Sequence, residues 1–257
     1  ACGPWCQGPA LLQVLNVVGG MNVTDMQHNG ADYIHGLTEA VELVMADRDA
    51  YLGDPRFVDV PMEALLSAGY ADQRRAEIRM DRAFPEMPAA IAAQALGLSA
   101  GRRLPARPEP TPKSPGADLD TSFCCVVDRH GNVFSATPSD ASYHGGVIPG
   151  VGMTISPRGN QSWTDADHPS CLAPGKRPRL TPNPAIAIRN GNEFMPFGTP
   201  GGDVQTQAML QVFLNVFAWG MEPQAAIEQP RFASYSFPSS FEPHEYYPGL
   251  LKLEGRI

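Results

Sequence analysis

The segment "DTSFCCVVDRHGNVFSATPSD", residues 120–140, tells most about the fold of this chain. Residues 122–127 and 133–137 are rich in Cys, Val and Phe, a composition typical of β-strands. Residues 128–132 between them, "DRHGN", have the residue types of a tight turn. The sequence therefore predicts a β-hairpin whose first strand is buried and is opened by Thr121.

Composition places the chain among ordinary globular proteins. It has 257 residues, of which 43% are hydrophobic and 18% charged, enough for one large domain or two small ones. The net charge of −8 predicts a surface that repels phosphate backbones, which argues against a nucleic-acid partner. No apolar run approaches the ~18 residues of a membrane span, so we expect no membrane association.

The five cysteines are an odd number at irregular spacing, which favours a reducing compartment such as the cytoplasm. A signal peptide upstream of Ala1 would instead place the protein in the periplasm. Cys2 and Cys6 have three residues between them rather than the two of a redox dithiol motif. Cys124 and Cys125 alternate on the first hairpin strand, where we expect them to serve packing.

Two parts of different character follow one another along the chain. Residues 1–120 are predicted to be helical and to end in a proline-rich segment over residues 102–116. Residues 121–257 are predicted to be rich in strands before they become helical. The predicted helices cover residues 9–18, 31–52, 62–66, 71–79, 89–98, 205–219 and 223–227. Beyond the first hairpin, strands are predicted over residues 147–156, 185–188 and 193–197.

Thr121 has two interpretations. A threonine hydroxyl is a weak nucleophile, but the residue's own α-amino group can activate it once Thr121 is a chain terminus. This requires cleavage of the Asp120–Thr121 bond, and the proline-rich segment before it is suited to moving away. In the other interpretation Thr121 is an ordinary strand residue, since threonine is common in strands.

Residues 198–202, "GTPGG", precede a predicted helix, where backbone N–H groups favour negative charge. The loop suits a phosphate or an oxyanion, and equally a structural turn, although no Walker-type lysine follows. His168 lies near Asp165 and Asp167, but no second histidine is close and the spacing matches no common ligand pattern. The sequence therefore predicts neither a metal site nor a cofactor.

Five segments together resemble the γ-glutamyltransferase family of N-terminal-nucleophile hydrolases, and they occur in the family's order. The resemblance covers nearly the whole chain. The segments are "ADRDAYLGDPRF" (46–57), "DTSFCCVVDRHGN" (120–132), "GKRP" (175–178), "GTPGGD" (198–203) and "QPRF" (229–232).

The resemblance implies an α+β fold, an αββα four-layer sandwich, and a zymogen that cleaves itself between Asp120 and Thr121. Residues 1–120 would then be the end of a large subunit, and residues 121–257 would belong to the small subunit. Both would build one domain from one precursor. The oligomeric state stays open, a homo-oligomer included.

The resemblance also assigns roles at the site. Thr121 would be the nucleophile and its freed amine the base. Ser139 falls where the family has a second threonine that hydrogen-bonds the nucleophile. Gly201 and Gly202 match the backbone donors of the oxyanion hole. The threonyl ester would be attacked by water or by an amine.

Departures from the family concern the substrate. Gln161 replaces the acid that binds the substrate's α-amino group, and a neutral amide cannot pair with an ammonium as a carboxylate does. Arg158 stands where a glutamine is usual, Leu180-Thr181 replace a Ser-Ser pair, and Ala141 replaces an asparagine. The family's carboxylate-binding arginine would lie upstream of the first residue, so we expect the chain to be a fragment.

Three functions follow from these observations. The first is a self-processing threonine amidohydrolase or acylase that acts on a small-molecule amide but is not selective for γ-glutamyl groups. The second is a true γ-glutamyltransferase of glutathione metabolism, and the third is an unprocessed, non-catalytic relative. Arg158 and Arg179 favour an acyl group that carries a carboxylate, unless they are solvated surface arginines.

Overall fold

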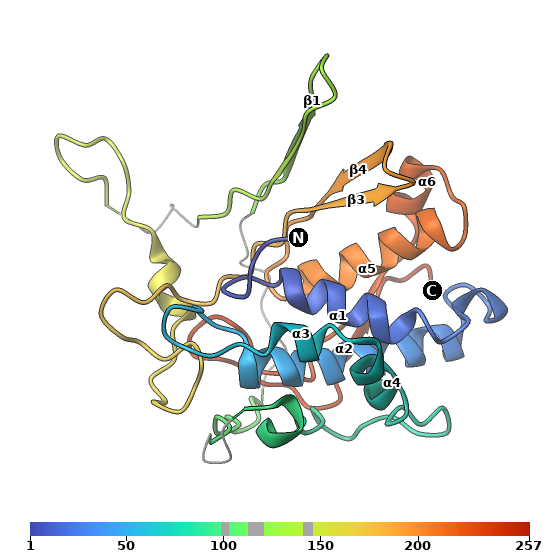
Figure 1. The fold of residues 1–257 in the computed structure, drawn as a ribbon, viewed down its shortest axis with the longest axis horizontal. Helices are drawn as coiled ribbons and strands as arrows, with labels where there is room; N and C mark the ends of the chain where they lie inside the picture. Colours follow the sequence, from blue (N-terminus) through green and yellow to red (C-terminus); the bar gives the residue numbers. More distant parts are fainter. Residues whose placement is uncertain (99–102, 113–120, 141–145) are drawn as a thin grey trace.

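The computed structural model describes residues 1–98, 103–112, 121–140 and 146–257. Helices form the packed body of the chain, and two β-hairpins extend from it (Figure 1). The chain is thus a mixture of α and β structure. Within the described residues, no helix is both long and apolar enough to cross a bilayer.

The core lies where four helices meet. α1 (Gly8–Val18) contacts α2 (Ala31–Tyr51), α4 (Ala68–Arg75) and α5 (Val204–Phe217), so the two predicted parts of the chain share one core. α2 is buried on nearly every side and carries charged as well as apolar residues into the interior. Its burial explains why charged residues of α2 need partners on other elements.

The shorter helices deviate more from the predictions than the long ones do. α3 and α6 are found within one residue of the predicted bounds, but α4 spans Ala68–Arg75 instead of the predicted 71–79. The predicted helix 89–98 is only the short 3-10 helix η2. The predicted strand 147–156 is a turn closed by one bridge between Val147 and Thr154, because Gly150 and Gly152 adopt positive φ. The short elements are η1 (Val23–Asp25), α3 (Met62–Leu65), η2 (Ala93–Leu96), η4 (Pro157–Gln161) and α6 (Pro223–Glu228).

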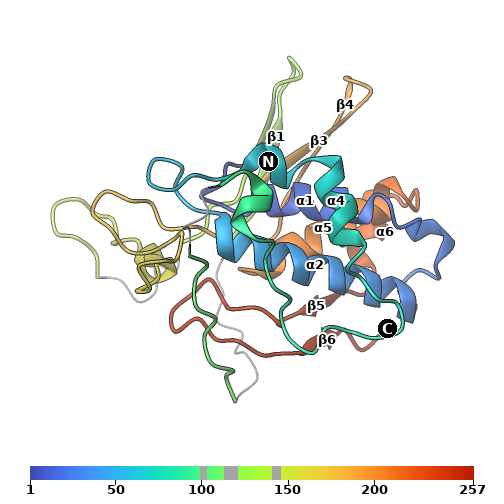
Figure 2. The same cartoon turned by 60° about the horizontal axis from the view of Figure 1, so that its bottom comes forward.

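Three antiparallel strand pairs complete the fold of the described residues. Their bounds are β1 (Cys124–Val127) with β2 (Val133–Ala136), β3 (Ala185–Arg189) with β4 (Glu193–Phe197), and β5 (Phe232–Ser234) with β6 (Leu251–Leu253). β2 runs beside β4, and β5 lies against α2 and α5 (Figure 2). The sequence did not predict β5 and β6, which are three residues long each.

Asp128 explains why the first hairpin turns where it does. One of its carboxylate oxygens accepts hydrogen bonds from the backbone N–H groups of His130, at 2.8 Å, and Asn132, at 2.9 Å. Gly131 has φ of +82°, a left-handed conformation that glycine adopts without strain. These interactions fix the length of the turn and hence the pairing of the two strands.

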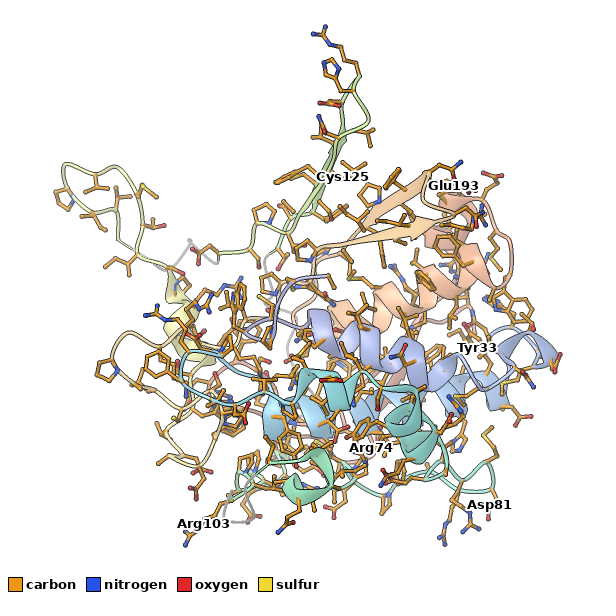
Figure 3. All side chains as sticks on the ribbon, in the orientation of Figure 1. Tyr33, Arg74, Asp81, Arg103, Cys125 and Glu193 are labelled. Atoms are coloured by element: carbon orange, nitrogen blue, oxygen red, sulfur yellow. The ribbon has the colours of Figure 1, made fainter. Side chains whose placement is uncertain are left out.

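The first strand is not buried, contrary to the prediction. All four residues of β1 are exposed, including Cys124 and Cys125, so the expectation that these cysteines serve packing is wrong for the described chain. Figure 3 shows Cys125 on the projecting hairpin, away from the helical body. Val126, Val127 and Phe134 are each about 60% exposed, because no described element covers them. Apolar surface of this kind is typical of an interface.

Candidate active site

The register of the first hairpin places Thr121 opposite Ser139. Cys124 pairs with Ala136, and continuing that pairing three residues outward reaches these two residues. The backbone N–H of Ser122 donates to the carbonyl of Pro138 at 3.0 Å, so the strands stay together beyond β1 and β2. Thr121 Oγ1 and Ser139 Oγ are 2.5 Å apart, a hydrogen-bond distance.

Arg158 binds Ser139 from the other side. It belongs to η4, whose start is capped by Ser156 Oγ. The Arg158 Nε donates to the Ser139 carbonyl at 2.9 Å, and its Nη2 donates to both the carbonyl and Oγ of Ser139. A guanidinium therefore lies one side chain away from the candidate nucleophile.

Gln161 and Thr181 are buried next to Arg158. The Arg158 Nη1 donates to Gln161 Oε1 at 3.2 Å and lies 3.5 Å from Thr181 Oγ1. Gln161 Nε2 in turn donates to Thr181 Oγ1 at 3.3 Å. Three of the four residues predicted to bind substrate thus form one cluster. Leu180 does not join it with a polar atom, and its N–H donates to the carbonyl of Trp5 at 2.7 Å.

The glycine loop lies beside the start of the hairpin. A Cβ on Gly198 would come within 2.5 Å of the Phe123 ring and 3.2 Å of Thr137 Oγ1, so only glycine fits there. Gly201 and Gly202 have φ of +122° and +55°, and their carbonyls accept the first hydrogen bonds of α5. The sequence was therefore right that this loop opens a helix.

A cavity of about 950 Å³ opens next to this loop. Gly201, Asp203 and Phe241 are among its lining residues. The hydrogen-bonded side chains of Thr121, Ser139, Arg158, Gln161 and Thr181 form the Thr121 cluster. The guanidinium of Arg158 lies over the Phe241 ring, 5.8 Å from its centroid, which connects this cluster to the cavity. Thr121 itself is not among the described residues that line the cavity.

Asp203 anchors the glycine loop, a role that the sequence did not predict. Its carboxylate accepts hydrogen bonds from the backbone N–H and the hydroxyl of Ser240, both at 2.7 Å, and from Gln7 at 2.6 Å. It also pairs with Arg48, which is fully buried on α2. The one available signal was that Arg48 and Asp203 each lie in a segment resembling the family.

Arg179 is buried and is not a solvated surface arginine. Its guanidinium donates to the Arg48 carbonyl at 2.9 Å and to Asp49 at 3.0 Å. Burial alone would raise the pKa of the Asp49 carboxyl, but His168 and the two arginines hold it below its usual range. Its backbone N–H donates to Ser170 Oγ at 2.9 Å, and that hydroxyl donates to the Gln161 carbonyl at 3.3 Å. Arg179 therefore stabilises the interior, and its backbone is linked to Gln161 through Ser170.

His168 completes this buried network. Its Nδ1 accepts from the Ser170 N–H at 2.9 Å, so Nε2 carries the proton and faces Asp49 at 3.4 Å. Burial lowers the pKa of His168 to about 4. The ring stacks on Trp163, with centroids 4.1 Å apart. Among the described residues, no group of three or more potential ligands is arranged to hold a metal ion.

Two positions of interest lie outside the described residues. They are Asp120, on the other side of the bond expected to be cleaved, and Ala141.

The comparison with protein families matches residues 1–250 of the chain to the Gamma-glutamyltranspeptidase model. The chain belongs to the γ-glutamyltranspeptidase family.

Several curated members of this family are similar to the chain. The glutathione hydrolase-like YwrD proenzyme of Bacillus subtilis is 31% identical over 89% of the chain, and the acylase ACY 1 proenzyme of Pseudomonas sp. (strain SE83) is 32% identical over 89%. The oxamate amidohydrolase proenzyme of Klebsiella pneumoniae is 31% identical over 89%. The chain spans only 37–39% of the length of these relatives.

Solved structures agree with this assignment. The structure of LmbA2991HD has 36% identity and a TM-score of 0.84, and the match covers 99% of the chain and 44% of that protein. A cephalosporin acylase from Bacillus halodurans has 30% identity and a TM-score of 0.66, over 90% of the chain and 38% of that protein. Both of these proteins thus share the fold of this chain.

Proposed function

We propose that the full-length protein carrying this chain is a self-processing amidohydrolase or acylase with Thr121 as its nucleophile. The observation that carries the proposal is the 2.5 Å contact between Thr121 Oγ1 and Ser139 Oγ, which the hairpin register sets. The Ser139 hydroxyl is close enough to orient and polarise the Thr121 hydroxyl, which is otherwise a weak nucleophile. The proenzyme relatives support self-processing.

Processing begins with attack of Thr121 Oγ1 on the carbonyl carbon of Asp120. The C–N bond breaks, an ester forms between the two residues, and the nitrogen becomes the α-amine of Thr121. Water then hydrolyses the ester, which releases the Asp120 carboxylate and restores the hydroxyl. The products are a fragment that ends at Asp120 and a fragment that begins at Thr121.

Catalysis repeats this chemistry on a separate amide. The Thr121 α-amine accepts the hydroxyl proton while Oγ1 bonds to the acyl carbon, and the proton then leaves with the amine product. Gly201 and Gly202 supply the backbone N–H groups for the oxyanion, since left-handed glycines at a helix start can aim donors at one point. Water or a second amine then takes the acyl group from the ester.

The acyl group is not γ-glutamyl in this proposal. Selective binding of an α-ammonium requires a carboxylate, but Gln161 is neutral, fully buried and hydrogen-bonded to Thr181. Arg158 brings a positive charge to the same cluster, which would repel an ammonium. The acylase and oxamate amidohydrolase relatives support a substrate outside the glutathione class.

We further propose that the complete protein forms the four-layer αββα sandwich. Residues 1–120 and 121–257 already share one core through the contact of α1 with α5. The exposed apolar residues of β1 and β2 leave a sheet face for further layers, and the full-length relatives have the additional chain to supply them.

The experiment is expression of the full-length protein followed by intact-mass analysis and a panel of acyl anilides. We expect two fragments divided before Thr121, an acyl adduct on the second fragment, and slow or no release of chromophore from a γ-glutamyl anilide. A single intact chain after long incubation would instead identify a non-catalytic relative. Rapid turnover of the γ-glutamyl anilide, accelerated by glycylglycine, would identify a true γ-glutamyltransferase.

A further inference from the structure

Arg158 is close enough to Thr121 to act on it through one intervening hydroxyl. Its Nη2 donates to Ser139 Oγ, and Ser139 Oγ lies 2.5 Å from Thr121 Oγ1. The guanidinium is also held in place, since Nε donates to the Ser139 carbonyl at 2.9 Å and Nη1 to Gln161 at 3.2 Å. Several hydrogen bonds of this kind fix both the position and the plane of the group.

The chemistry of these groups fixes the hydrogen bond from Arg158 to Ser139 and allows the one from Ser139 to Thr121. A guanidinium has only donors, so Ser139 Oγ accepts from Arg158. A serine hydroxyl has a single proton, and this arrangement leaves that proton available to Thr121 Oγ1. A hydroxyl oxygen can accept two hydrogen bonds, so either hydroxyl can be the donor between Ser139 and Thr121. When Ser139 donates to Thr121 Oγ1, the proton of Thr121 can be transferred to a base.

We propose that Arg158 is a positioning residue that polarises Ser139 and so stabilises negative charge as it develops on Thr121 Oγ1. This inference rests on the proposed function of Thr121. The Arg158 charge acts through a donor chain that ends on the attacking oxygen, and such preorganised donors stabilise transition states strongly. The polarised hydroxyl would assist both self-cleavage and acyl transfer, since Thr121 Oγ1 attacks in each.

A different role for Arg158 makes a different prediction. If Arg158 only binds a carboxylate on the substrate, its removal affects acyl groups that carry one and spares those that do not. If it acts through Ser139, both kinds of acyl group are affected alike. Two small esters, 4-nitrophenyl acetate and mono-4-nitrophenyl glutarate, separate these roles because only the second carries a carboxylate.

The test compares the full-length protein with Arg158→Gln, Arg158→Lys, Ser139→Ala and the double variant Ser139→Ala/Arg158→Gln. The readouts are the rate of self-cleavage, which needs no substrate, and the rate of Thr121 acylation by each ester, both followed by mass spectrometry. Thermal unfolding shows whether each variant is folded. Arg189→Gln is the matched control, because Arg189 is an exposed arginine on β3 that pairs with Glu193.

We expect Arg158→Gln to slow self-cleavage and acylation by both esters by about 10- to 100-fold, the usual effect of losing a hydrogen bond from a charged donor. Arg158→Lys should recover part of the rate. In the Ser139→Ala background, Arg158→Gln should change the rates by less than about 3-fold, since coupled residues are not additive.

Two results would overturn the inference while leaving the proposed function intact. One is an Arg158→Gln variant that reacts with 4-nitrophenyl acetate as fast as the wild type does. The other is a double variant whose fold-loss in rate equals the product of the fold-losses of the two single variants. If the wild-type protein itself neither cleaves before Thr121 nor accepts an acyl group there, the proposed function fails and this inference fails with it.

Discussion

Arg48, buried on α2, pairs with the carboxylate of Asp203, the residue that directly follows Gly202. The two residues come from the two parts of the chain that cleavage before Thr121 would separate. The same carboxylate binds Ser240 through both its backbone and its side chain. The position of the glycine loop therefore depends on a charge buried in the helical core.

Breaking the Arg48–Asp203 pair should destabilise the protein and slow acylation. We expect Arg48→Gln to lower the free energy of unfolding by about 3–5 kcal/mol, because it leaves the carboxylate without its buried cation. Urea unfolding of the full-length protein measures this. Arg256→Gln is the control, since that exposed pair with Glu254 should contribute no more than about 1 kcal/mol. Equal effects for both variants would contradict the anchoring role.

Gly201→Ala should impair catalysis more than folding. The added Cβ would be 3.5 Å from Val204, an ordinary contact, so the cost is the backbone strain of a positive φ, about 1–3 kcal/mol. Displaced oxyanion donors should reduce acylation by about 10²-fold or more. Gly131→Ala is a matched control, because it introduces similar strain at φ of +82° in the hairpin turn. It should lose stability and keep its acylation rate.

Thr121→Ala should leave the precursor uncut and without an acyl adduct, since the variant lacks the hydroxyl that both reactions need. Thr121→Ser keeps the hydroxyl and the amine and should retain part of both activities. Intact-mass analysis over time distinguishes the three proteins. Normal cleavage in Thr121→Ala would place the nucleophile elsewhere.

His168 should make the protein less stable in mild acid. Its pKa is about 4 in the folded protein and about 6.5 when unfolded, so the unfolded chain takes up the proton first as pH falls. The contribution of neutral His168 to the free energy of unfolding is fully present above the pKa of the unfolded chain, about 6.5. It is lost as pH falls through the pKa in the folded protein, about 4. Between about pH 7.5 and pH 5, unfolding free energy should fall by about 2 kcal/mol from this group.

The control for this prediction is His168→Gln, which lacks the titrating ring. Urea unfolding at the two pH values should show a smaller fall in the variant than in the wild type. The loss of stacking on Trp163 lowers the stability of the variant at both values and therefore cancels in the difference. An unchanged pH dependence would mean that His168 does not stay neutral in the folded protein.

Glu42 should have the opposite pH dependence. Burial raises the pKa of its carboxyl to about 8, so the folded protein holds a proton that the unfolded chain releases. Stability is therefore lost as pH rises from the unfolded pKa toward about 8. We expect Glu42→Gln to be more stable than wild type by about 1–3 kcal/mol at about pH 8 and nearly equal at about pH 5.

The long helices α2 and α5, the first hairpin and the contact between Thr121 and Ser139 could be predicted from sequence. Apolar spacing located α2 and α5, and the turn chemistry of Asp128 and Gly131 located the first hairpin. Once a hairpin with that turn is accepted, strand pairing alone brings Thr121 to Ser139. These are local relationships, in which residues close in sequence determine their own geometry.

Other features depend on residues far apart in the chain. Nothing in the spacing of Arg48 and Asp203 indicates that they pair, because tertiary packing of α2 against the start of α5 brings them together. The exposure of Cys125 was also not predictable, since an apolar strand pattern does not say which segment covers it. β5 and β6 are too short to show a period.

The pairing of Thr121 with Ser139 makes the spacing between them matter more than the residues that fill it. One residue added to the turn would shift every later partner and turn the facing hydroxyl to the opposite side of the ribbon. Substitutions within β1 and β2 do not shift the strand pairing, because they leave the number of residues unchanged. We therefore expect homologous proteins to differ in the residues of the two strands. The number of residues between the positions of Thr121 and Ser139 should stay constant.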